Sequence, residues 1–160
     1  GHADLAPGNP LEQELLNVLH TRHEGVCWET VLSGPGLVNL YEAVAVMWGM
    51  PAESLAPEEI SRLGVTVEDP LCHQTLELFF ALLGSAAGNL AWTVCAHGGV
   101  YLGGGIAPKS LPRLRRPQFL DGFLDKGRMR PLMERMPVRV ILNGQIPLLG
   151  AARYMAAAAR

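Results

Sequence analysis

The glycine-rich turn Gly103-Gly104-Gly105 is the feature of this sequence most suited to binding chemistry. It follows the apolar segment Val100–Leu102 and precedes a predicted helix near Lys109. Glycine lacks a Cβ atom, so a ligand can approach the backbone closely, and amides at a helix N-terminus favour anions. The segment has neither the Gly-Lys-Ser/Thr of a Walker loop nor the dinucleotide-binding fingerprint. By themselves these residues are equally consistent with a nucleotide site and with a tight structural turn.

Glu29 and His2 are the next candidates for ligand binding. Glu29 lies in the segment Trp28–Leu32, which predicts a short strand. A carboxylate at the start of a buried strand needs partners, and sugar hydroxyls are suitable because a carboxylate can accept two O–H bonds. The alternative is an exposed glutamate at the end of a strand. His2 lies in a terminal Gly-His pair, which is also typical of a frayed end or a cloning remnant.

Other catalytic and metal-binding patterns are not found in the sequence. Ser33 lies in Leu-Ser-Gly-Pro-Gly and not in the Gly-x-Ser-x-Gly of a nucleophile elbow. His20 and His23 are three apart without an evident third ligand, so we expect them on a surface face rather than at a metal. No catalytic residue and no metal site are therefore predicted. Free buried thiols are expected for the cysteines, which have no Cys-x-x-Cys spacing: Cys27, Cys72 and Cys95.

Composition places the chain among globular domains and argues against nucleic acid as a partner. Its 160 residues are 49% hydrophobic and 18% charged, with a formal net charge of −2. This apolar balance fits either a well-filled core or a surface that meets another domain or subunit. There is no basic excess for nucleic acid, and the short cluster Arg113, Arg115 and Arg116 near Lys109 is expected to be a solvated face.

We predict no membrane span. The most apolar stretch, Leu76–Ala96, is interrupted by polar residues and predicts a buried helix. No secretory signal is visible, so a cytoplasmic protein is expected. Because the chain begins at Gly1 rather than at a methionine, we expect a piece of a longer protein.

Helix caps and turn residues outline the elements that would position these candidates. Gly84 and Gly88 lie on one side of the longest predicted helix, which indicates close approach of another backbone. Strands alternate with helices, which predicts an α/β domain with a mixed or parallel sheet flanked by helices. The strands are few, so further strands are expected from before residue 1. The predicted helices and strands are as follows: helices 10–23, 35–47, 57–63 (ended by Gly64), 70–95, 117–124, 129–136 and 147–159, and strands 28–32, 100–103 and 138–142.

Four segments together resemble the bacterial glucokinase family of actin-like sugar kinases. Residues 29–41 and residues 88–91 with 98–108 carry the most specific match, and residues 1–7 and residues 123–128 with 147–151 support it. The resemblance covers nearly the whole chain and implies an actin-like (ribonuclease H-like) sugar-kinase fold. It also implies ATP-dependent phosphorylation of glucose, the entry step of glycolysis, with ATP and Mg²⁺ as cofactors.

The resemblance assigns roles to particular residues. It implies that His2 and Glu29 bind glucose hydroxyls and that Gly103, Gly104 and Gly105 belong to the adenosine motif. Gly103 stands where the family often has alanine. The family's phosphate loops, its catalytic aspartate and a further sugar-binding glutamate have no counterpart in residues 1–160.

The chain is accordingly expected to be the C-terminal domain portion of a glucokinase, incomplete and inactive without its N-terminal half. The N-terminal domain, glucose and a second copy of the protein in a homodimer are the expected partners. Two alternatives stay open: a sugar-sensing regulator of the same superfamily without catalysis, and a truncated product that acts mainly in oligomerisation.

Overall fold

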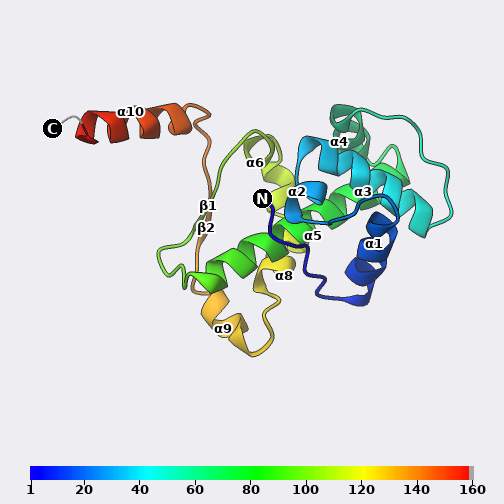
Figure 1. Ribbon diagram of the computed structural model, residues 1–160, viewed down its shortest axis with the longest axis horizontal. Coiled ribbons are helices and arrows are strands. Elements are labelled where there is room, and N and C mark those ends of the chain that lie inside the picture. Colours follow the sequence, from blue (N-terminus) through cyan, green and yellow to red (C-terminus); the bar gives the residue numbers. More distant parts are fainter. Residues whose placement is uncertain (159–160) are drawn as a thin grey trace.

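Two of the longer helices begin where their capping residues predict. The computed structural model describes residues 1–158 (Figure 1). Asn9 accepts a hydrogen bond from Glu12 N and begins α1 (Pro10–His20). Asp69 accepts one from Cys72 N at 2.6 Å and begins α5 (Pro70–Thr93). A proline in the first turn follows each cap, where its missing N–H costs nothing.

The other helices and strands include several elements of only three or four residues. Ser33 caps α3 by accepting a hydrogen bond from Gly36 N. Strand β1 leads through four short helices and one 3₁₀ turn to β2. The bounds are as follows: α2 (Trp28–Val31), α3 (Gly34–Met47), α4 (Pro57–Thr66), β1 (Val100–Leu102), α6 (Ile106–Lys109), α7 (Leu111–Leu114), α8 (Pro117–Leu124), η1 (Gly127–Met129), α9 (Arg130–Met133), β2 (Val138–Val140) and α10 (Ile146–Ala158).

Helix α5 lies at the centre of the helical body (Figure 1). It packs against α8 along one side and against α3 and α4 along the other. A Cβ atom on Gly84 would lie 2.0 Å from the carbonyl oxygen of Phe119, and one on Gly88 would lie 2.5 Å from that of Phe123. The predicted close approach of another backbone is therefore confirmed, and α8 is its partner. By length and composition α5 could cross a membrane, but here it is the core helix of the fold.

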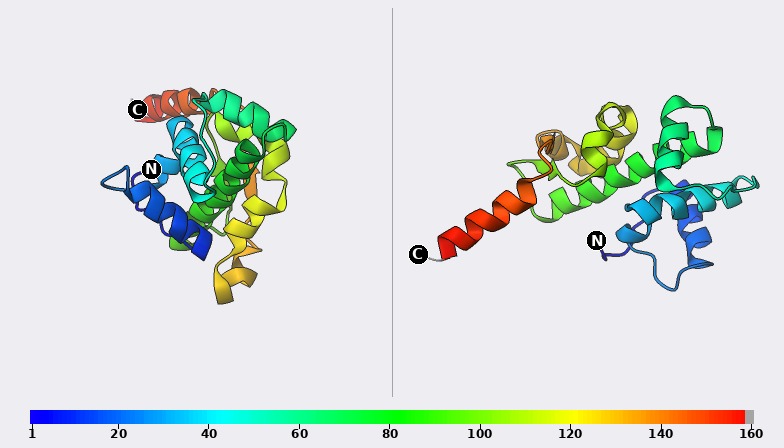
Figure 2. Two further views of the ribbon diagram at one scale, coloured as in Figure 1. Left: turned by 90° about the vertical axis from the view of Figure 1, so that its right-hand side faces the viewer. Right: turned by 90° about the horizontal axis from the view of Figure 1, so that it is seen from above.

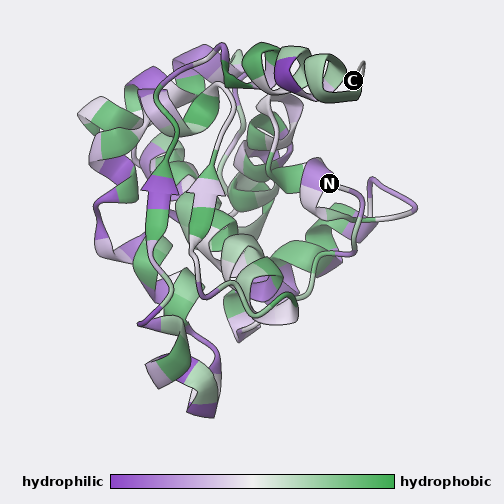
Figure 3. Ribbon diagram, turned by 90° about the vertical axis from the view of Figure 1, so that its left-hand side faces the viewer, coloured by the Kyte–Doolittle hydropathy of each residue, from purple (hydrophilic) through white to green (hydrophobic). Residues whose placement is uncertain are grey.

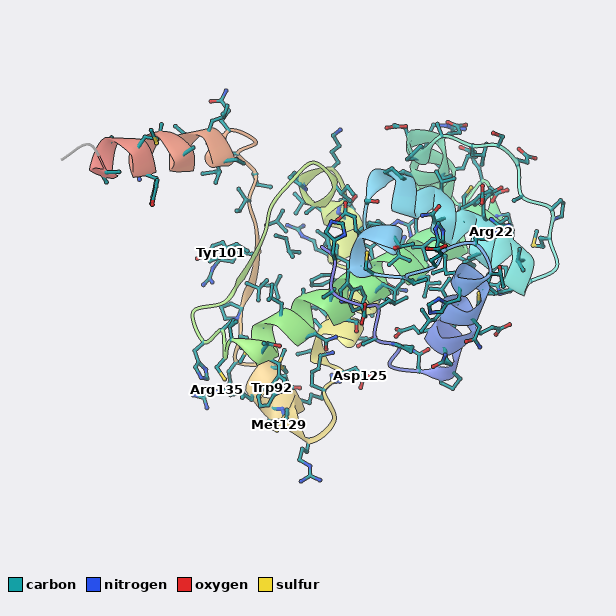
Figure 4. All side chains as sticks on the ribbon, in the orientation of Figure 1. Arg22, Trp92, Tyr101, Asp125, Met129 and Arg135 are labelled. Carbon is teal, nitrogen blue, oxygen red and sulfur yellow. The ribbon has the colours of Figure 1, made fainter. Side chains whose placement is uncertain are left out.

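The sheet is smaller than the sequence pattern suggested. β1 and β2 are parallel, with Val100 opposite Val138 and Tyr101 opposite Arg139. Figure 3 shows the two strands side by side. Tyr101 is 61% exposed and projects away from the helices (Figure 4), and Arg139 lies 5.6 Å from the centre of its ring. A parallel sheet is normally covered on both faces, whereas the face that carries Tyr101 is uncovered in the described chain.

Helix α10 leaves the body altogether. It follows β2 and projects outward as a separate rod (Figure 2). None of its described residues, Ile146–Ala158, is buried. The predicted last position, Ala159, lies outside the described residues.

Three of the predicted elements differ from the structure. Residues 28–32 form helix α2 instead of a strand, because Cys27 caps it and the Thr30 hydroxyl accepts a hydrogen bond from Cys27 N. Helix α4 continues past Gly64 to Thr66. A Cβ atom on Gly64 would lie 2.6 Å from the carbonyl oxygen of Cys72, so the glycine serves close packing and does not end the helix. The predicted helix 129–136 is divided into η1 and α9.

Candidate functional site

The first five residues pair with the start of α2 and carry His2 to it. Glu29 N donates to the carbonyl of Gly1 at 3.0 Å, and Trp28 N donates to that of Ala3 at 3.0 Å. Asp4 forms an antiparallel bridge with Cys27. The N-terminal segment is thus part of the fold. His2 and Glu29 come from two segments of the chain that are hydrogen-bonded to each other.

Glu29 lies in the first turn of α2 and is exposed, so the predicted strand is wrong, whereas the exposed position agrees with the alternative left open by the sequence. A Cβ atom on Gly1 would lie 3.4 Å from its Oε2 atom. The carboxylate therefore faces the N-terminal segment that carries His2. An exposed carboxylate at a helix N-terminus is stabilised by the helix dipole and retains its capacity to accept hydrogen bonds from a ligand.

Cys27 is a feature of this region that sequence reasoning missed. Its Sγ atom lies 3.8 Å from Nδ1 of His2 and 3.5 Å from the Thr30 hydroxyl oxygen. Hydrogen bonding, first from the Thr30 side chain and then from His2, lowers the pKa of the Cys27 thiol from 9.0 to about 7. It is half-buried and Cys95 is exposed, so only Cys72 matches the expected buried thiol. Thr30, three residues after Cys27, was the available capping signal.

The Leu-Ser-Gly-Pro-Gly segment is a tight joint between α2 and α3. The Ser33 hydroxyl donates to the carbonyl of Glu29 at 2.9 Å and accepts from Gly36 N at 2.9 Å. Asn39 donates to the carbonyl of Thr30 at 2.9 Å. A Cβ atom on Gly36 would lie 2.7 Å from the carbonyl carbon of Val31. These contacts fix the orientation of α2, and so of Glu29, relative to the body.

A cavity of about 440 Å³ runs from this joint to the glycine-rich turn. Its apolar residues come from α3, α5 and α6, and the exposed charges Glu58 and Lys109 stand on its wall. Ser33 lines one end, and Gly105 lines another part. Neither His2 nor Glu29 lines the cavity itself. The complete lining is as follows: Ser33, Gly34, Leu37, Pro57, Glu58, Ser61, Leu76, Phe79, Phe80, Gly105, Ile106, Lys109 and Ser110.

The glycine-rich turn is exposed and lies between two hollows. Gly103, Gly104 and Gly105 all line a second cavity of about 260 Å³, which Ile141 and Asn143 also line. Gly104 has a φ of +94°, which favours glycine and supports the structural-turn interpretation. A Cβ atom on Gly104 or Gly105 would meet nothing within 4 Å. Packing inside the described chain does not require glycine at 105, and the open space around it fits an approaching ligand.

No group of three or more His, Cys, Asp or Glu side chains in residues 1–158 could hold a metal ion. His20 is exposed and His23 half-exposed at the end of α1. The site contains one carboxylate, one imidazole, one thiol and a set of open backbone amides. Such an arrangement can orient a polyhydroxylated ligand and an anion.

Comparison with known proteins gives this geometry a family. The model of the family described as glucokinase matches residues 1–158. This chain belongs to the glucokinase family. Glucokinase of Photorhabdus laumondii is 40% identical over 155 residues, which span 97% of this chain and 48% of the relative. Glucokinase of Aromatoleum aromaticum is 43% identical over 152 residues, which span 95% of this chain and 46% of the relative.

The solved structures agree on the fold. A glucokinase from an Antarctic psychrotroph matches with a TM-score of 0.89 and 42% identity, over 95% of this chain and 47% of that one. A glucokinase from Balamuthia mandrillaris, solved in complex with glucose, matches with a TM-score of 0.68 at 24% identity, over 86% of this chain and 41% of that one, and shows the fold alone. The fold is thus that of an actin-like sugar kinase. The chain spans about half the length of the relatives it matches and corresponds to their C-terminal portion.

Proposed function

We propose that the complete protein transfers a phosphoryl group from ATP to glucose and that residues 1–160 form its C-terminal domain portion. The observation that carries the proposal is the cavity that joins Ser33, which is hydrogen-bonded to Glu29, with Gly105 of the glycine-rich turn. A kinase must hold its two substrates next to each other. The cavity supports that requirement because it reaches Ser33, which holds the backbone of the proposed sugar-binding Glu29, and Gly105 of the proposed nucleotide-binding turn.

On the sugar side, we assign Glu29 and His2 to glucose hydroxyls. Glu29 is exposed and anchored through its own backbone by Ser33 and Gly1, so its carboxylate can accept hydrogen bonds without rearrangement. Each charged hydrogen bond of this kind contributes about 1.5–3 kcal/mol. A site built on hydroxyl recognition also rejects analogues that lack those hydroxyls.

On the nucleotide side, we assign Gly103, Gly104 and Gly105 to the adenosine end of ATP. The open space over Gly104 and Gly105 fits a ligand against the backbone. The adjoining cavity offers apolar surface from Phe79, Phe80 and Ile106 for an aromatic base. ATP would supply the transferred phosphoryl group when bound, and the glycine-rich turn would hold and orient its adenosine end.

Mg²⁺ accompanies ATP in the proposed reaction, but residues 1–158 contain no side-chain cluster that fits this ion. None of the residue roles proposed for this chain involves the metal. The general base and the phosphate loops are likewise assigned to the half of the protein that these residues do not include. We therefore expect the isolated 160-residue chain to have no measurable kinase activity.

We also assign the N-terminal half of the protein as the partner of the exposed end formed by β1, β2 and α10. The relatives are about twice as long as the chain, and α10 and the outer face of Tyr101 expose apolar surface. We propose that the N-terminal half covers both. A cytoplasmic location, a role at the start of glycolysis and a homodimer complete the proposal.

The test is a coupled glucose-6-phosphate assay on the complete protein, with glucose and ATP each omitted in turn. We expect turnover that requires both substrates. Binding of glucose without turnover would instead support the sugar-sensing regulator, and absence of both would remove the sugar site. Robust product formation by the 160-residue chain alone would contradict the assignment of the catalytic base to the other half.

A further inference from the structure

Arg113, predicted to be part of a solvated basic face, is buried. Only 4% of it is exposed, whereas the neighbouring Arg116 is exposed by 46%. Its Nη1 atom donates to Glu77 Oε1 of α5 at 2.6 Å. Its Nη2 atom donates to the carbonyl oxygen of Gly64 in α4. One side chain on α7 thus reaches two other helices in the interior of the fold.

The acceptor on α4 is a group that needs such a donor. Gly64 lies in the last turn of α4, where helix carbonyls have no partner within the helix. His73 Nδ1 lies 3.1 Å from the same oxygen and 3.5 Å from Arg113 Nη2. A positive charge at a helix C-terminus is also favoured by the helix dipole. Arg113 and His73 together therefore close the end of α4.

The two helices that Arg113 contacts, α4 and α5, also line the cavity of about 440 Å³. Pro57, Glu58 and Ser61 of α4 form part of its wall. Lys109 of α6 and Ser110, the residue between α6 and α7, form another part. From α7, directly after the second part of this wall, Arg113 reaches Gly64 of α4, the helix that carries the first part. Its length and planar fork therefore fix the distance between them.

The position of the glycine-rich turn depends on the same segment. Gly105 is the cap of α6, and α7 follows α6 directly through Ser110. Apart from Arg113, the segment of α6 and α7 has only Ala107 and Leu114 buried. Two apolar contacts have no directional geometry, whereas a guanidinium that donates to Glu77 and Gly64 through separate nitrogens restricts the orientation of the segment. Arg113 is thus the polar anchor of the segment that carries the turn.

We propose that Arg113 is a positioning residue for the nucleotide, which holds the glycine-rich turn and the α4 wall at the separation that the nucleoside requires. Glu77 acts as its counterion and Gly64 as its second anchor. This inference rests on the proposed function, because it treats the cavity beside Gly105 as the nucleotide site. It predicts a loss that is specific to the nucleotide and spares the sugar.

The experiment uses the complete protein and the conservative change Arg113→Lys. Lysine keeps the charge, but its donors sit on one nitrogen instead of the two nitrogens of a planar fork, so it holds Glu77 and Gly64 less rigidly. We expect the KM for ATP and the Kd for ADP to rise about tenfold or more, since small misplacements in a binding site have effects of this size. We expect the KM for glucose to stay within about twofold, because Glu29 is anchored through Ser33 and Asn39.

Two further variants make the result specific. Arg116→Lys alters the exposed arginine that lies 3.4 Å from the same Glu77 carboxylate, and we expect both KM values to stay unchanged. Glu77→Gln keeps the shape of the acceptor but removes its charge, and we expect a nucleotide defect smaller than that of Arg113→Lys. The melting temperature of each variant is measured first, and kinetics are recorded well below it.

The outcomes separate this inference from the proposed function. A folded Arg113→Lys protein with unchanged affinity for ADP and ATP overturns it, and so does an equal rise in both KM values, which indicates general loosening. A wild-type protein that binds ADP but makes no glucose-6-phosphate overturns the proposed function, and ADP affinity then decides the inference. A wild-type protein that binds no nucleotide overturns both.

Discussion

The helical body around α5 and the end formed by β1, β2 and α10 are built on opposite principles. In the body, glycines bring α5 and α8 into backbone contact, and Phe119 and Phe123 are almost fully enclosed. At the other end, α10 exposes 74% of Leu148 and 76% of Tyr154, and Figure 3 shows how much of this helix is hydrophobic. The body thus encloses a packed core, whereas none of the described residues of α10 is buried.

The largest test of this difference is truncation of a core residue against truncation of an α10 residue. In the 160-residue chain, Phe123→Ala should lower the free energy of unfolding by about 3–5 kcal/mol, because it empties a closed site. Leu148→Ala should change it by less than about 0.5 kcal/mol, because Leu148 is mostly exposed. Urea unfolding followed by circular dichroism measures both.

The same leucine change sharpens the comparison in the complete protein. If the N-terminal half covers α10, Leu148→Ala there should cost about 2 kcal/mol or more, as buried leucines do. An equally small effect in both proteins would mean that α10 has no partner in the other half.

A second test places one chemical change in both helices. Gly84→Ala puts a Cβ atom 2.0 Å from the Phe119 carbonyl oxygen, which must push α8 away, and we expect a loss of about 3 kcal/mol. Gly150→Ala in α10 meets nothing within 4 Å and should stabilise the helix by up to about 1 kcal/mol. Thermal unfolding of the two variants beside wild type gives both values, and a stabilising Gly84→Ala would contradict the close packing of α5 on α8.

A third test compares two thiols of the body. The pKa of Cys27 is lowered to about 7, so its reactive thiolate persists to lower pH than in an ordinary cysteine and is lost as pH falls through 7. Burial raises the pKa of Cys72 to about 12, and its thiol should stay inert. Iodoacetamide labelling from pH 6 to 9, followed by peptide mass spectrometry, should show labelling of Cys27 with a midpoint near 7. A midpoint near 9 would remove the contribution of Thr30 and His2, and Cys27→Ser identifies the labelled peptide.

Sequence reasoning succeeded where local chemistry decides the structure. The caps Asn9 and Asp69 placed α1 and α5, and the spacing of Gly84 and Gly88 predicted the close approach of another backbone. It failed at residues 28–32, where the cap at Cys27 and Thr30 outweighed the preference of the residues for a strand. Burial of Arg113 was also missed, because its partner Glu77 lies 36 positions away and only the tertiary fold brings them together.

The candidate site divides in the same way. The sequence placed the glycine-rich turn and named His2 and Glu29 through the family resemblance. It could not predict that the N-terminal segment pairs with the start of α2, because the hydrogen-bonded residues Gly1 and Glu29 are far apart in the sequence. Nor could it predict the cavity between Ser33 and Gly105, whose wall comes from helices α3 to α6.

The most direct measurement is calorimetric titration of the complete Glu29→Gln protein with glucose and, separately, with ATP. Glu14→Gln, on the exposed side of α1, is the matched control. We predict that Glu29→Gln weakens glucose binding by about ten- to a hundredfold, which corresponds to one charged hydrogen bond, and leaves ATP affinity unchanged. Unchanged glucose affinity in a folded Glu29→Gln protein would remove Glu29 from the sugar site and contradict the account at its centre.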